Sequence, residues 1–155
     1  MKIIDALELK IPPPLLMLFF ATAMYMLDIL LPNNSQTSFH TAFAIALLIF
    51  GVSFALSGIY SFRQVKTTAH PSKPERASSL VTSGVYKITR NPMYLGLFCV
   101  LMAWAIILGN VYTFIVPFIF AFYISRFQIM PEERALEGIF GDAFTAYKQK
   151  VRRWI

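Results

Sequence analysis

Four apolar runs, each nearly free of charged side chains, constrain this chain more than any other feature. They cover residues 14–31, 42–62, 95–108 and 111–130. A helix of about 20 apolar residues crosses the ~30 Å hydrocarbon core of a bilayer. The third run approaches that length when Pro92 occupies its first turn, where the missing N–H of proline leaves no helical bond unmade. The sequence therefore predicts transmembrane helices at roughly 14–31, 42–62, 92–108 and 111–130.

The composition agrees with lipid as the surrounding solvent. Hydrophobic residues make up 57% of the 155 residues and charged residues 14%, whereas a soluble domain carries about 25% charged residues. The single cysteine, Cys99, lies inside the third run, so cysteine supplies neither a disulfide framework nor a metal cluster. We expect one all-α integral membrane domain spanning residues 1–155, with no bound metal.

The basic residues set the expected orientation. Two of the 14 Lys and Arg residues precede the first run, six lie between the second and third, and six lie at or after the end of the fourth. The other two loops, residues 32–41 and 109–110, contain none. The positive-inside rule then places both termini and the long middle loop in the cytoplasm, with the chain in the inner membrane. The net charge of +6 follows from these basic residues, and we expect anionic lipid headgroups to be their partners. No nucleic-acid-binding motif is present in the sequence.

Beyond Pro131 the apolar residues recur at three- and four-residue spacing, with charged residues between them. The stripe contains Leu136, Ile139, Phe140, Ala143, Phe144, Tyr147 and Val151. This pattern predicts a cytoplasmic amphipathic helix, kinked at Gly138 or Gly141. It lies on the membrane or folds back over the bundle, and the second arrangement would shield a pocket from water.

Two polar segments adjoin the third and fourth apolar runs at the predicted cytoplasmic face, residues 66–96 and 131–155. Taken singly, Asn91-Pro92 is an ordinary helix start and Glu132-Glu133 is ordinary chemistry for a first helical turn. In that turn, free backbone N–H groups and the helix dipole favour ionised carboxylates. Together, at one membrane face, the two segments indicate a functional site.

The motifs in these segments resemble those of the isoprenylcysteine carboxyl methyltransferase family of integral membrane enzymes. The matching stretches are Ser78-Ser79-Leu80-Val81, Thr82-Ser83-Gly84-Val85-Tyr86, Arg90-Asn91-Pro92-Met93-Tyr94 and Glu132-Glu133, followed by Phe140-Gly141. The resemblance covers roughly residues 66–155, and the first two helices match only in hydropathy. It implies an S-adenosylmethionine-dependent methyltransferase, here with asparagine at position 91 instead of the family's usual histidine.

The resemblance also assigns candidate residues. The implied cofactor-binding residues are Ser78, Ser79, Leu80, Val81, Tyr86, Arg90, Asn91, Pro92, Met93, Tyr94 and Glu132. His70 joins them as a candidate, although exposure to solvent in the loop is the favoured explanation for this residue. The family's substrate-contacting arginine falls closest to Gln128, with Arg126 nearby. We therefore assign Arg126, Gln128 and Glu133 to the catalytic, acceptor-facing part of the site.

The implied reaction is methyl transfer to a lipophilic acceptor that enters from the bilayer. The acceptor group is the carboxylate of an isoprenylcysteine-like lipid, a phospholipid amine or a thiol, since resemblance of fold does not fix the substrate. The alternative of a different class is a membrane partner protein that keeps the scaffold without the chemistry. Binding of S-adenosylhomocysteine distinguishes the enzyme from the partner protein.

Overall fold

The computed structural model describes residues 8–31, 38–65 and 77–155, and every regular element among them is a helix. The all-helical prediction is thus confirmed for this part of the chain. In order, the elements are α2 (Pro13–Leu30), α3 (Ser38–Gln64), η2 (Gly84–Lys87), α4 (Pro92–Leu108), η3 (Val111–Phe114), α5 (Ile115–Ile124), η4 (Ser125–Ile129), α6 (Met130–Phe140) and α7 (Asp142–Lys150).

Three helical stretches within the described residues are long and apolar enough to cross a membrane: Pro13–Leu30, Thr41–Gln64 and Val111–Phe140. The fourth apolar helix, α4, has 17 residues and begins at Pro92, as the sequence predicted. Large apolar side chains remain exposed along these helices, Leu18 and Phe122 among them. Exposed apolar side chains at this density suit contact with lipid.

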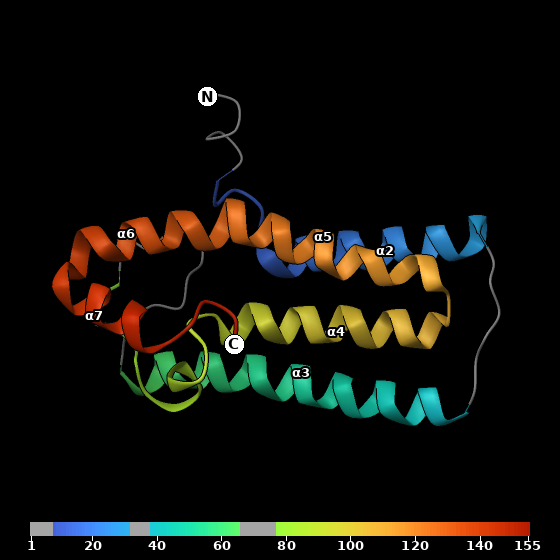
Figure 1. The fold of residues 1–155 in the computed structure, drawn as a ribbon, viewed down its shortest axis with the longest axis horizontal. Helices are drawn as coiled ribbons and strands as arrows, with labels where there is room; N and C mark the ends of the chain where they lie inside the picture. The colour runs from blue at the N-terminus through green and yellow to red at the C-terminus, as the bar shows by residue number, and fades with distance from the viewer. Residues whose placement is uncertain (1–7, 32–37, 66–76) are drawn as a thin grey trace.

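The helices α3 and α4 lie side by side along most of their length (Figure 1). Glycines permit this close approach. A Cβ atom on Gly51 would lie 2.8 Å from the carbonyl oxygen of Gly96, and one on Gly96 would lie 2.5 Å from that of Gly51. Small residues at a helix contact allow two backbones to pack closely in a membrane. At one end of this helix pair, η2 packs against α3, and α4 begins at Pro92.

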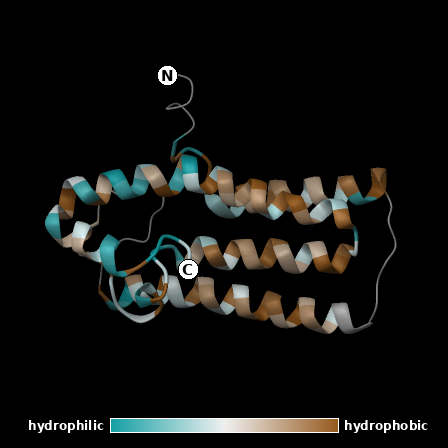
Figure 2. Ribbon diagram, viewed as in Figure 1, coloured by the Kyte–Doolittle hydropathy of each residue, from teal (hydrophilic) through white to brown (hydrophobic). Residues whose placement is uncertain are grey.

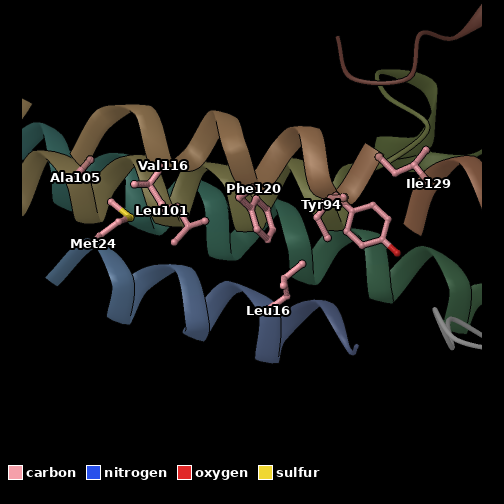
Figure 3. Packing of buried hydrophobic residues seen from close by; sticks show 9 residues of the cluster. Leu16, Met24, Tyr94, Leu101, Ala105, Val116, Phe120 and Ile129 are labelled. Atoms are coloured by element: carbon pink, nitrogen blue, oxygen red, sulfur yellow. The ribbon is translucent and has the colours of Figure 1, made fainter. Parts of the chain in front are cut away.

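The core of the bundle lies between α2, α4 and α5. Figure 3 shows Leu16, Leu101 and Phe120, one from each of these helices, gathered in the middle of the bundle. Tyr94 lies toward one end of the same cluster, next to Ile129 (Figure 3). The core therefore fixes the position of Tyr94, whose hydroxyl points beyond the cluster.

The fourth predicted helix is longer than expected, because α5, η4 and α6 run on to Phe140 with no break at Pro131. Proline has no N–H, so the carbonyl four residues earlier, on Phe127, loses its helical donor. The backbone N–H of Leu9 donates to that carbonyl instead, at 3.0 Å. The π-helical turn η4 widens the helix at the same place. A contact from a distant part of the chain thus satisfies the group that proline exposes.

Hydrophilic residues gather at one end of the bundle, on α6, α7 and the segment around η2, whereas α2, α4 and α5 are predominantly apolar (Figure 2). The amphipathic stretch after Pro131 forms two helices that meet at Gly141, which has φ +50°. The α7 helix turns back toward the ends of α3 and α4 (Figure 1). Both polar segments identified in the sequence therefore lie at the same end of the molecule.

Candidate active site

Gly84 shapes the segment that precedes α4. Its φ of +60° favours glycine, and a Cβ atom there would lie 2.9 Å from the hydroxyl oxygen of Ser61. The short helix η2 follows, and the ring of Tyr86 packs edge-on against Phe62 at a centroid distance of 5.4 Å. These contacts hold η2 against the end of α3.

The start of α4 brings Tyr94 to the first turn of α6. Pro92 opens α4, and Tyr94 is buried two residues later. Its hydroxyl donates a hydrogen bond to Glu132 Oε1. This bond joins the two polar segments, which are 38 residues apart in sequence.

A pocket surrounds this bond. It encloses about 80 Å³ and is partly open to the surface, so a nucleoside-sized ligand, which usually requires ~300–1,000 Å³, would occupy the mouth as well. The walls are mostly apolar and aromatic, with two carboxylates and one guanidinium. The lining residues are Phe62, Ala77, Ser79, Leu80, Val81, Tyr86, Arg90, Asn91, Met93, Tyr94, Glu132, Glu133, Leu136, Phe144 and Tyr147.

Arg90 connects several parts of the pocket wall. Its Nη2 donates to Glu133 Oε1 at 2.8 Å, and its Nη1 donates to the carbonyls of Lys148 and Val151, both at 3.1 Å. Its Nε is buried and has no hydrogen-bond partner among the described residues. A buried charged donor without a partner is costly, so this N–H is a candidate to bind an anionic ligand group.

The α7 helix closes one side of the pocket with Phe144 and Tyr147. The hydroxyl of Tyr147 donates to the carbonyl of Tyr86 at 2.7 Å. Burial raises the pKa of Tyr147, and burial together with the neighbouring Tyr147 and Glu132 raises that of Tyr86. Both phenols therefore remain neutral at physiological pH and keep their protons for hydrogen bonding.

Most of the residues predicted from the motifs line this one pocket: Ser79, Leu80, Val81, Tyr86, Arg90, Asn91, Met93, Tyr94, Glu132 and Glu133. Ser78 is exposed and Pro92 is buried, and neither is part of the lining. His70 lies outside the described residues. Both oxygens of Glu133 are bound by arginines, Oε1 by Arg90 and Oε2 by Arg153 at 2.6 Å.

Arg126 and Gln128 do not line this pocket but bind the segment that precedes α2. Arg126 Nη1 donates to Glu8 Oε1 at 2.7 Å, and Arg134 pairs with the other oxygen of Glu8. Gln128 is fully buried and its Nε2 donates to the carbonyl of Ile11 at 2.8 Å. The acceptor-facing role that the resemblance implies for this pair stays a prediction.

Five lining residues were not among the predicted candidates: Phe62, Ala77, Leu136, Phe144 and Tyr147. A signal existed for three of them, since Leu136, Phe144 and Tyr147 belong to the apolar stripe after Pro131. That stripe indicated a buried face but not its partner. Phe62 and Ala77 carry no comparable signal in the sequence.

The residues around the pocket fit the cofactor that the resemblance implies. Aromatic and aliphatic walls suit an adenine ring, and Glu132 offers a carboxylate to ribose hydroxyls or an ammonium group. The unpartnered Nε of Arg90 offers a donor to a carboxylate. Among the described residues, no group of His, Cys, Asp or Glu side chains is arranged to hold a metal ion.

The fold and the pocket together define a helical membrane protein with a polar site at one end of its bundle. The profile of the phospholipid methyltransferase family matches residues 39–143, about two thirds of the chain. The chain belongs to that family. This membership supports the motif resemblance on which the sequence prediction rested.

Two relatives extend the comparison. The chain is 49% identical over 63 residues to an uncharacterized protein of Haemophilus influenzae, an alignment that covers 41% of this chain and the whole of the relative. It is 29% identical over 121 residues to protein-S-isoprenylcysteine O-methyltransferase of Schizosaccharomyces pombe. That alignment covers 76% of this chain and 50% of the relative, so the chain spans about half of the yeast protein. No solved structure matches the chain significantly.

Proposed function

We propose that this chain transfers a methyl group from S-adenosylmethionine to a lipophilic acceptor at the cytoplasmic face of the inner membrane. The observation that carries the proposal is the pocket in which Tyr94 and Glu132 meet, because it unites the two motif segments in a family of methyltransferases.

When bound, S-adenosylmethionine supplies an electrophilic methyl group on a sulfonium centre. The chain's own contribution is binding, alignment and exclusion of water, which together lower the barrier of a displacement reaction by several kcal/mol. Glu132 accepts hydrogen bonds from the donor's hydroxyls or ammonium, and Tyr94 fixes the orientation of this carboxylate. Ser79, Leu80, Val81, Tyr86 and Met93 border the adenosine part in this proposal.

A second, almost wholly apolar pocket supports a lipophilic acceptor. It has a volume of about 340 Å³ and lies between α2, α3 and α4, lined by Pro13, Pro14, Ala55, Ile59, Met93, Tyr94 and Leu97. Met93 and Tyr94 line both pockets. An acyl or prenyl chain held there would meet the polar pocket at these two residues.

The acceptor group itself is proposed to be the carboxylate of an isoprenylcysteine-like lipid, with a phospholipid amine as the second candidate. The yeast relative's name supports the first and the family description supports the second. Arg126, Gln128 and Glu133 are the proposed acceptor-facing residues. Arg126 already binds a carboxylate, that of Glu8, which supports its capacity to hold an acidic headgroup.

We further propose that α4 is the fourth membrane crossing in this one-domain protein. Its 17 residues span about 25 Å at 1.5 Å per residue, and local thinning of the bilayer accommodates a shortfall of that size. The amphipathic helices α6 and α7 then lie in the cytoplasm beside the polar pocket. Both termini share that compartment because of the distribution of Lys and Arg.

Incubation of the purified protein with methyl-labelled S-adenosylmethionine and a membrane lipid extract tests the proposal. We expect label in an organic-soluble product, and base-labile label would identify a carboxyl ester rather than a methylated amine. Glu132→Gln, assayed in parallel, should yield much less label. Absence of lipid-soluble label with the wild-type protein, across prenylcysteine and phospholipid acceptors, would contradict the proposed activity.

A further inference from the structure

The stretch of chain after α7 contacts two parts of the pocket wall, namely the segment before α4 and the first turn of α6. We call residues 151–155 the tail segment. Its first residue, Val151, leaves the helix in an extended conformation. The residues that follow form hydrogen bonds with residues 89–91, with Glu133 and with Ser125.

The first set of contacts binds the tail segment to the wall that precedes α4. The carbonyl of Arg153 accepts hydrogen bonds from Thr89 Oγ1 at 3.1 Å and from Asn91 Nδ2 at 2.9 Å. The backbone N–H of Arg90 donates to the carbonyl of Arg152 at 3.0 Å. Thr89 and Asn91 are both buried. Three consecutive residues of the wall therefore hold two consecutive carbonyls of the tail segment.

The second set binds the tail segment to the opposite wall. The guanidinium of Arg153 donates to both oxygens of Glu133, from Nη2 at 2.6 Å and from Nε at 3.2 Å. Such paired, charge-assisted bonds fix direction as well as distance. Glu133 is the neighbour of Glu132 in the first turn of α6. Arg153 thus binds one wall through its backbone and the other through its side chain.

The third contact anchors the far end of the tail segment. Trp154 packs against the hydrophobic core, and its Nε1 donates to Ser125 Oγ at 3.2 Å. Ser125 begins the π-helical turn η4. The tail segment is therefore held at three separate places on the scaffold that carries the pocket.

We propose that Arg153 is a positioning residue for the cofactor pocket, because it joins the wall of residues 89–91 to Glu133 and so fixes Tyr94 and Glu132 relative to each other. This inference rests on the proposed function and deepens it. It also gives Asn91 a role different from that of the family's histidine. The Asn91 side-chain amide nitrogen holds the tail segment, and the same residue lines the pocket.

The test compares two neighbouring arginines in S-adenosylhomocysteine binding, measured by calorimetry on the full chain in detergent. Arg153→Ala should weaken binding roughly threefold to tenfold, because a partly exposed charge-assisted pair contributes only modestly. Arg152→Ala is the matched control, because the Arg152 side chain is exposed and its replacement removes the same charge. The affinity of this variant for S-adenosylhomocysteine should stay within about twofold of wild type. Equal affinities for wild type and Arg153→Ala, or equal losses for both variants, would overturn the proposal.

Two further variants separate positioning from a general loss of stability. Arg153→Lys keeps the charge but not the paired geometry, so it should fold and show an intermediate affinity. The double variant Arg153→Ala/Glu133→Gln should bind no more weakly than Glu133→Gln alone, since both changes remove one interaction. Additive losses would mean that Arg153 does not act through Glu133. Absence of S-adenosylhomocysteine binding in the wild-type protein would contradict both the proposed function and the positioning role. Unchanged binding in the variants would contradict the positioning role alone.

Discussion

At the scale of single residues, the chemistry centres on Tyr94 and Glu132. Tyr94 is fixed by the core through its ring, and its hydroxyl fixes the carboxylate of Glu132. Glu133, one residue further on, is occupied by Arg90 and Arg153. Two adjacent glutamates thus line the same pocket with different partners, Glu132 bonded to a tyrosine and Glu133 paired with two arginines.

Replacement of Glu132 by glutamine exchanges the carboxyl group for an amide of nearly the same shape. We expect S-adenosylhomocysteine affinity to fall about ten- to a hundredfold, because hydrogen bonds to a charged group contribute ~1.5–3 kcal/mol. Glu137→Gln is the control on the same helix, since Glu137 is half exposed and pairs with Lys148 outside the pocket. Calorimetric titration of both variants measures the difference. Unchanged affinity in Glu132→Gln would show that Glu132 does not bind the ligand and only occupies the first turn of α6.

The acceptor-facing role proposed for Arg126 leads to a test at Glu8. Glu8 holds both Arg126 and Arg134, so an acceptor carboxylate would compete with it. Glu8→Gln should then lower the KM for a carboxylate acceptor severalfold and leave the KM for the cofactor unchanged. A raised acceptor KM would show instead that Glu8 serves by holding the segment that precedes α2.

At the scale of elements, the sequence predicted the helices well and their junctions less well. Pro92 begins α4 where the sequence placed it, because proline at a helix start is a local signal. Pro131 was expected to end the fourth helix, but the helix continues. The donor that satisfies the Phe127 carbonyl comes from Leu9, a contact that no local pattern contains.

For the site, too, local sequence patterns predict the residues but not their contacts with distant parts of the chain. Its motif residues could be located from their order along the chain, and the apolar stripe marked Phe144 and Tyr147 as one face of a helix. The partner of that face could not be predicted, since it depends on the turn at Gly141 and on the tail segment. The bond between Arg126 and Glu8, 118 residues apart, is of the same kind.

The contact between α3 and α4 can be tested by matched changes at two glycines. Gly51→Ala places a Cβ atom within 2.8 Å of a backbone oxygen, so we expect a loss of roughly 1–3 kcal/mol in stability from overpacking. Gly138→Ala meets nothing within 4 Å and should be neutral or stabilise α6 by about 0.5–1 kcal/mol. Thermal unfolding in detergent compares the two. Equal melting temperatures would show that the contact between α3 and α4 accommodates the added methyl group without loss of stability.

At the scale of the whole molecule, polarity is distributed along the long axis of the bundle. Apolar helices make up most of its length, and the more hydrophilic α6 and α7 lie at one end (Figure 2). Residues of both of these helices line the pocket. All Lys and Arg residues are predicted to lie on the side of that end. A polar cofactor from the cytoplasm and an apolar acceptor from the bilayer would therefore meet at the membrane boundary.

The proposed orientation predicts the outcome of reporter fusions. Fusions after Asn33 and after Ile155 should report opposite compartments, with the second in the cytoplasm, because the positive-inside rule governs short loops. A cytoplasmic reading at both positions would contradict four crossings. It would also place the loop after α2 on the same side as the pocket.

Binding of S-adenosylhomocysteine to the purified wild-type protein tests the central claim most directly. We predict saturable binding close to one ligand per chain, accompanied by thermal stabilisation. A ligand at 100 times its dissociation constant adds about 2.7 kcal/mol to the stability of the folded state, and S-adenosylhomocysteine should do so while adenosine does so less. Absence of both heat and stabilisation at saturating ligand would contradict the assignment of this pocket to a methyl donor.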